Sequence, residues 1–318
     1  MIEILHGDAL EKIKLLKDKS IDCIVTSPPY WQLRDYGVAG QLGLEDTVEE
    51  YIEKLLKIFD ECWRILKDAG TVFINMGDTY SNVNSKFISG SNNKNYYIDK
   101  QTAKTRKKTD IRRKSKMMIP ERFAIVMIER GWILRNEIIW HKPNVLPESV
   151  QDRFTNDFEK IYFFTKNEKY FFEKQYEAFA EKTLTAFKDG IMPTGKKKML
   201  GAGESRTGMR EVNKPWKAAY NEKGRNMRTV WKIATKGISE AHFATFPEEL
   251  VRRCILAGCS ENGIVLDPFL GSGTTLKVTK KLNRNGIGIE LNQEYIQIAK
   301  KRIGNDLFNE LQVKTDIN

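Results

Sequence analysis

Asp267-Pro-Phe-Leu-Gly-Ser-Gly-Thr-Thr275 is the segment of this sequence that says most about its fold. It follows Ile264–Leu266, an apolar run predicted to be a buried strand, and it leads into Thr274–Leu282, which has helical spacing. A strand, a glycine turn and a helix in this order are typical of the ligand-binding edge of a parallel sheet, because glycine lets a ligand approach the backbone closely. The helix N-terminus also offers free N–H groups to a carboxylate.

Glu290 ends the next expected strand, Gly286–Glu290, and lies 23 residues after Asp267. An acid at about this distance beyond a glycine loop typically binds ribose hydroxyls. The loop is not Gly-x-Gly-x-x-Gly, which disfavours a dinucleotide, and no Gly-Lys-Ser/Thr follows it, which excludes a P-loop. A glycine turn that caps a helix without any ligand is the alternative interpretation.

Expected strands and helices alternate through the rest of the chain. Strands are expected at residues 2–5, 21–25, 71–75, 134–140 and 160–165, and helices at residues 9–16, 51–66, 121–130, 247–257 and 293–303. Gly70 is expected to stop the second of these helices. The alternation predicts an α/β fold with a doubly wound, mostly parallel, Rossmann-like sheet.

Thr26-Ser-Pro-Pro-Tyr30 follows the buried strand at 21–25 and carries candidate chemistry. Two prolines fix the backbone, so the Pro28 carbonyl is held rigidly and cannot pair with an N–H of Pro29. Ser27 adds a hydroxyl acceptor. Two acceptors aimed at the N–H groups of an aromatic amine would turn its lone pair toward an electrophile, and Tyr30 could stack on a flipped base. A rigid turn without chemistry is the bland alternative.

The net charge of +11 is concentrated in two segments. Residues 100–116 hold nine lysines and arginines against one acid, and residues 182–236 hold fourteen against four, so the rest of the chain is acidic. Trp216, Tyr220 and Trp231 are interspersed in the second segment, although some of these rings are expected to fill a small core. Concentrated positive charge with interleaved aromatics favours a nucleic-acid partner, whereas two solvated lysine-rich loops are the alternative.

The composition argues against several other classes of protein. A hydrophobic fraction of 41% supports a packed core, and no apolar run is long enough to span a bilayer. The N-terminus lacks a signal-peptide pattern, so a cytoplasmic protein is expected. The four cysteines form no Cys-x-x-Cys pair, and no metal site is expected. Cys23, Cys62 and Cys254 are expected to be small buried apolar residues.

The two segments together resemble the DNA amino-methyltransferases of the permuted beta type, which transfer a methyl group from S-adenosylmethionine (SAM). In that type the Ser-Pro-Pro-Tyr segment precedes the glycine loop, and a target-recognition region lies between them, as in this chain. The resemblance covers most of the chain and fades at residues 79–116 and 178–225. Further similar stretches are His6–Leu10, Arg135–Asn144, Ser149–Arg153 and His242–Leu250.

The resemblance implies roles for individual residues. Ser27, Pro28, Pro29 and Tyr30 would hold the target base. The cofactor would be bound by Asp8, Ala9, Leu10, Phe246, Asp267, Phe269, Gly271, Ser272, Gly273, Thr274, Thr275 and Glu290. Asp8 is also a good helix N-cap, and both roles are compatible.

The domain organisation follows from the same resemblance. Residues 1–177 are expected to form the catalytic half of the methyltransferase domain, with a mobile loop at 79–116, and residues 237–318 its SAM-binding half. Residues 178–236 are the candidate target-recognition region. The candidate DNA contacts are Arg106, Lys107, Lys108, Arg112, Arg113, Lys196, Lys197, Lys198, Arg206, Arg225 and Arg228.

Ser27 favours the N4 amine of cytosine as the target, because Asp or Asn more often stands at this position in adenine-N6 enzymes of the family. Adenine N6 is the alternative. An RNA or protein-glutamine methyltransferase and a catalytically silent DNA-binding module are remoter alternatives. Duplex DNA is the expected substrate, and a cognate restriction endonuclease is an expected companion. A monomer and a homodimer both remain open.

The two basic segments predict that DNA affinity depends strongly on salt. Each phosphate contact releases a counterion, so affinity is expected to fall by more than roughly tenfold between about 50 and 200 mM salt. Fluorescence anisotropy with a labelled duplex measures this. A flat salt response would mean that the segments do not contact phosphates.

Overall fold

The structure is a computed structural model that describes residues 1–81, 111–181, 221, 223–235, 247–304 and 311–314. The described residues contain a nine-stranded sheet in the order β11-β1-β10-β9-β2-β3-β5-β4-β8. Its strands are β1 (Ile2–His6), β2 (Ile21–Thr26), β3 (Leu66–Met76), β4 (Ile133–His141), β5 (Phe158–Thr165), β8 (Val230–Lys232), β9 (Ile264–Asp267), β10 (Asn285–Glu290) and β11 (Leu311–Lys314). Only β5 runs antiparallel to its neighbours β3 and β4, so the expected mostly parallel sheet is confirmed.

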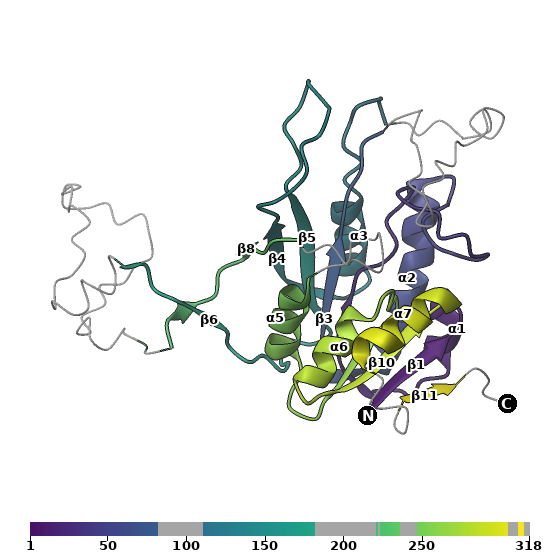
Figure 1. Cartoon of the computed structure of the whole chain (residues 1–318), viewed down its shortest axis with the longest axis vertical. Helices are drawn as coiled ribbons and strands as arrows, with labels where there is room; N and C mark the ends of the chain where they lie inside the picture. Colours follow the sequence, from purple (N-terminus) through teal and green to yellow (C-terminus); the bar gives the residue numbers. More distant parts are fainter. Residues whose placement is uncertain (82–110, 182–220, 222, 236–246, 305–310, 315–318) are drawn as a thin grey trace. The chain divides into compact units, whose positions relative to one another are not determined.

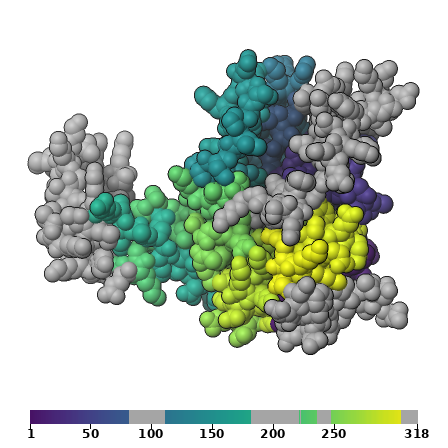
Figure 2. Space-filling model, in the orientation of Figure 1, coloured from purple at the N-terminus to yellow at the C-terminus, as the bar shows by residue number. Residues whose placement is uncertain are grey.

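Helices cover both faces of this sheet (Figure 1). They are α1 (Ala9–Lys14), α2 (Val48–Ile65), α3 (Ile119–Glu129), α5 (Glu248–Gly258), α6 (Thr274–Lys281) and α7 (Gln293–Ile303). The core under α1, α2 and α3 includes Tyr51, Phe59 and Phe123, and a second core under α6 and α7 includes Leu276 and Ile296. In the space-filling view, the yellow C-terminal residues lie on the near side of the molecule (Figure 2). Apolar faces on helices that flank a parallel sheet are what the doubly wound arrangement requires.

The junction between α2 and β3 differs from the sequence expectation. Gly70 was expected to end the helix, whereas α2 ends at Ile65 and the strand begins at once with Leu66. Leu66 has extended backbone angles (φ −71°, ψ 133°) and pairs with Ile21 of β2. The pairing of β3 with β2 therefore outweighs the helical periodicity of the preceding residues, and Gly70 lies inside the strand.

The two described ends of the segment expected to be a mobile loop, residues 79–116, pair with each other. The Ser81 N–H donates to the Ser115 carbonyl at 2.8 Å, and the Lys114 N–H donates to the Ser81 carbonyl at 2.8 Å. Tyr80 and Lys116 form an antiparallel bridge. The mobility of residues 79–116 stays a prediction, and residues 82–110 lie outside the described part.

Residues 174–228 form a second compact unit. In its described part, β6 (Tyr176–Glu177) pairs with β7 (Arg225–Asn226), and the Glu177 carboxylate accepts hydrogen bonds from both Arg225 and Arg228. The unit thus differs at both ends from the expected recognition region, 178–236. Trp231, expected among the basic residues of that region, lies in β8 of the main sheet and is buried.

The four cysteines are all buried and unpaired, so the expectation for Cys23, Cys62 and Cys254 is confirmed. Within the part of the chain that the structure describes, no helix has the length and apolar character to cross a bilayer.

Candidate active site

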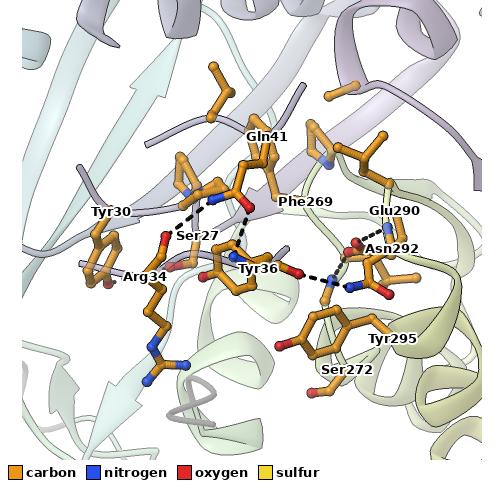
Figure 3. Close-up of a pocket in the computed structure, with 18 of the residues that line it drawn as sticks. Ser27, Tyr30, Arg34, Tyr36, Gln41, Phe269, Ser272, Glu290, Asn292 and Tyr295 are labelled. Carbon is orange, nitrogen blue, oxygen red and sulfur yellow. Dashed lines mark hydrogen bonds between the residues drawn. The ribbon is translucent and has the colours of Figure 1, made fainter. Parts of the chain in front are cut away.

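A cavity of about 620 Å³ opens at the carboxyl ends of β1, β2, β9 and β10. The segments that follow these four parallel strands line it, because the carboxyl ends of parallel strands meet at one edge of a sheet. In the close-up, Ser27 and Tyr30 lie on one side and Glu290, Asn292 and Tyr295 on the other, with Phe269 and Tyr36 between them (Figure 3). The first and last thirds of the sequence therefore share one cavity.

The glycine loop after β9 curls toward Glu290. Gly271 and Gly273 have positive φ values of 54° and 84°, which favour glycine. The Gly271 N–H donates to Glu290 Oε2 at 2.7 Å, and the Asn292 N–H donates to Oε1 at 2.8 Å. A side chain on Gly273 would place its Cβ 2.8 Å from the Ala299 Cβ, so α7 packs directly against the loop. The loop is thus fixed in shape by β10 and α7.

Burial of the Glu290 carboxyl raises its pKa, and the two backbone N–H donors offset only part of that effect. A buried carboxylate with its oxygens held in place at the end of a strand suits hydroxyl groups as ligands. Burial is also the cause of the raised pKa of Tyr295, whose ring meets Tyr36 edge to face at 6.0 Å. These two aromatic rings form an apolar wall of the cavity next to Glu290.

The position of Asp8 is compatible with both roles expected from the sequence, helix capping and cofactor binding. Its carboxylate accepts the Glu11 N–H at 3.1 Å and so caps α1, and the residue also lines the cavity. The structure shows the capping contact directly.

Asp267 has a different position from the one expected. Its side chain is fully buried and does not line the cavity. The Thr26 hydroxyl donates to Oδ1 at 2.6 Å, the Thr275 hydroxyl to Oδ2 at 2.5 Å, and the Phe269 N–H to Oδ1 at 3.1 Å. Asp267 therefore joins the end of β2 to the glycine loop from inside the protein.

Ser27-Pro-Pro-Tyr30 is held by contacts that local sequence does not reveal. The Tyr51 hydroxyl of α2 donates to the Pro29 carbonyl at 2.8 Å. The Tyr30 ring lies against Gly77, where an added Cβ would come within 2.3 Å of it. Because Gly77 has no side chain, the ring can turn into the cavity wall. The Pro28 carbonyl, the expected acceptor, immediately precedes these two anchored residues.

Tyr30 also joins a polar cluster that sequence reasoning missed. Its hydroxyl donates to Glu159 of β5 at 2.7 Å and accepts from Asn75 of β3 at 2.7 Å. Lys142 pairs with Glu159, and its ammonium lies 4.6 Å from the centre of the Trp140 ring. All five of these side chains line the cavity.

The expected site residues divide into three groups. Those that line the cavity are Asp8, Ala9, Ser27, Pro28, Pro29, Tyr30, Phe269, Gly271, Ser272, Thr274 and Glu290. Those that lie behind it are Leu10, Asp267, Gly273 and Thr275, because Leu10 packs on the core and the other three fix the glycine loop. Phe246 lies outside the described residues.

The candidate DNA contacts are described only in part. Arg112 and Arg113 are exposed beside the Tyr80–Lys116 bridge. Arg225 and Arg228 both pair with Glu177 in the second unit, so their charge is partly balanced there. Outside the described residues lie Arg106, Lys107, Lys108, Lys196, Lys197, Lys198 and Arg206.

Comparisons with known proteins agree on one group of enzymes. Residues 21–301 match the N6/N4 methyltransferase family model, described as DNA methylase. The chain is 37% identical to Type II methyltransferase M.Cfr9I of Citrobacter freundii, over 98% of this chain and 90% of that protein. It is 39% identical to Type II methyltransferase M.SmaI of Serratia marcescens, over 95% of this chain and 90% of that protein.

Solved structures of similar fold come from the same group. The PvuII DNA methyltransferase (cytosine-N4-specific) superposes with a TM-score of 0.62 at 18% identity, covering 95% of this chain and 86% of that one. The M1.HpyAVI–SAM complex superposes with a TM-score of 0.54 at 21% identity, covering 96% and 100%.

Asp267 predicts a pH dependence of stability. Burial raises its pKa from the ordinary 3.8 to about 6, although three hydrogen bonds oppose this. The folded state therefore holds this proton more tightly than the unfolded chain does, so the stabilisation is complete below about pH 4 and is lost as pH rises through about 6. Relative to Asp267→Asn, the unfolding free energy of the unmodified protein is expected to fall by roughly 3 kcal/mol between about pH 4 and pH 7.

Urea unfolding of the two proteins across this range measures the difference. A difference that stays constant with pH would contradict the assigned burial of the charge.

Proposed function

The chain belongs to the N6/N4 DNA methylase family, and we propose that this DNA methyltransferase modifies the N4 amine of cytosine at a specific site in duplex DNA. One observation carries the proposal. The Ser27–Tyr30 segment, which holds acceptors and an aromatic ring, lines the same cavity as the glycine loop after β9 and Glu290. An acceptor amine and a methyl donor need this kind of common cavity, because the transfer joins two substrates held within reach of each other.

The cofactor of this enzyme is S-adenosylmethionine, which supplies an electrophilic methyl group on a sulfonium. The described residues fit it. Glu290 offers a held carboxylate for ribose hydroxyls, and the Phe269, Tyr36 and Tyr295 rings offer apolar surface. Thr274 Oγ1 is buried without a hydrogen-bond partner in the described part of the protein, at a residue that lines the cavity. A polar ligand group there would satisfy it.

The residues at the other end would bind the target base. In the proposed mechanism, the Pro28 carbonyl and the Ser27 hydroxyl accept the two N–H groups of the base amine. These bonds draw the nitrogen toward tetrahedral geometry and direct its lone pair to the methyl group. Tyr30 supports the extruded base by stacking, which offsets part of the loss of base pairing. Both acceptors sit on a backbone fixed by two prolines and by Tyr51.

Ser27 supports cytosine over adenine as the target. Asp or Asn, and not serine, stands at this position in most adenine-N6 members of the family. Adenine N6 remains the alternative, since both targets are exocyclic amines on aromatic rings. The second compact unit, residues 174–228, is the proposed target-recognition region, with its basic residues as phosphate contacts. A cognate restriction endonuclease acting on the same site is the proposed companion of this activity.

The product nucleoside tests the proposal. Mixed-sequence DNA is incubated with the protein and SAM carrying a labelled methyl group, digested to nucleosides, and analysed by mass spectrometry. Label in N4-methyldeoxycytidine is the expected result. Label in N6-methyldeoxyadenosine would overturn the choice of base, and DNA binding without any transfer would identify a silent DNA-binding module. RNA, included as a parallel substrate, is expected to remain unlabelled.

A further inference from the structure

Glu159 is an ionisable residue in the cavity for which the mechanism above has no role. It enters from β5, the antiparallel strand, so its carboxylate reaches the cavity from the side opposite the glycine loop. Oε2 accepts the Tyr30 hydroxyl at 2.7 Å and the Asn75 amide at 2.8 Å, and Oε1 pairs with Lys142. Three donors therefore surround this largely buried carboxylate. They stabilise it, because an unpaired charge at this depth would be strongly destabilising.

The carboxylate sets the direction of the neighbouring hydrogen bonds. An ionised carboxylate only accepts hydrogen bonds, so the Tyr30 hydroxyl must donate its single hydrogen to Glu159. The Tyr30 oxygen is then left as an acceptor, and it receives the Asn75 amide at 2.7 Å and faces the Ser27 hydroxyl at 3.5 Å. Ser27 can therefore turn its own hydrogen toward Tyr30. The Ser27 oxygen accepts the Asn75 amide at 3.4 Å, and its second lone pair is left for an incoming amine.

Charge and burial keep this arrangement in one state. The Glu159 and Lys142 side chains are 16% and 17% exposed, so each neutralises the other out of bulk water. Burial, and next the Glu159 carboxylate, raise the pKa of Tyr30 well above its ordinary value, so its hydroxyl stays a donor at neutral pH. Lys142 is further held over the Trp140 ring.

We propose that Glu159 is a positioning residue that acts through the Tyr30 hydroxyl to orient the Ser27 hydroxyl as an acceptor for the target amine. The inference rests on the proposed function, since it deepens the role of Ser27 in that same site. Without the carboxylate, the Tyr30 and Ser27 hydroxyls could rotate so that Ser27 presents its hydrogen to the amine. That orientation repels the N–H groups it should bind and leaves the lone pair of the nitrogen undirected.

Glu159→Gln tests the role with little change of shape. The glutamine amide can donate as well as accept, so the direction of the hydrogen bonds from Ser27 through Tyr30 to residue 159 is no longer fixed. The single-turnover rate of methyl transfer is expected to fall roughly ten- to hundredfold, while the KM for SAM stays close to that of the unmodified protein. The thermal midpoint is expected to fall as well, because Lys142 loses its ion-pair partner. An unchanged rate, or a loss confined to KM, would overturn the proposal.

Tyr30→Phe tests the connection and does not depend on the folding of the first variant. Loss of the hydroxyl is expected to lower the rate about as much as Glu159→Gln does. In the double variant the two losses are expected not to multiply, since both remove the same connection. Multiplying losses, or a Tyr30→Phe variant with the unmodified rate, would mean that Glu159 does not act through Tyr30.

Glu121→Gln is the matched control. Glu121 pairs with Lys160, the residue after Glu159, and this ion pair is similarly buried (22% and 15% exposed) but does not line the cavity. Lys160 also pairs with Glu137, so it keeps one partner in this variant. Its loss is expected to leave the transfer rate unchanged. A rate that falls equally in both variants would mean that any lost ion pair on β5 disturbs the site. Methyl transfer to adenine would refute the cytosine assignment alone, because the coupling of Glu159 and Tyr30 is measured with either amine.

Discussion

The buried hydrogen bond from the Thr26 hydroxyl to the Asp267 carboxylate, 2.6 Å long, is the contact on which the site depends. These two residues are 241 positions apart, and each ends a strand immediately before a functional segment. Ser27 to Tyr30 follow the one, and the glycine loop follows the other. Because β2 and β9 are adjacent and parallel, this contact joins the two segments where both strands end at the cavity.

The elements of the sheet could be predicted from sequence because their signals are local. The strand at Ile264–Asp267 and the loop after it are read directly from an apolar run, two glycines and a helical pattern. The Glu159 cluster could not be predicted, because it depends on β5 lying antiparallel beside β3, which no local pattern encodes. The orientation of Asp267 could not be predicted either. The sequence shows an acid beside a glycine loop, whereas only the hydrogen bonds from Thr26 and Thr275 show that its side chain faces the protein interior.

The two ends of the cavity use carboxylates in different ways. Backbone N–H groups hold both oxygens of Glu290, and the role proposed for this carboxylate is to accept hydrogen bonds from the ribose hydroxyls of the donor. Glu159 is held by side chains and neutralised by Lys142, so it directs hydrogen bonds instead of binding a ligand itself. This division matches a transferase that must hold a donor molecule firmly and orient an acceptor group finely.

The proposed function requires that the Ser27–Tyr30 segment binds the target base while the glycine loop binds SAM. Ser27→Ala and Tyr30→Ala test it most directly when methyl transfer and SAM binding are measured on the same preparations. Transfer is expected to fall by more than roughly a hundredfold in each variant, while the dissociation constant for SAM is expected to change by less than about threefold. Unchanged turnover in either variant, or loss of SAM binding in step with turnover, would contradict it.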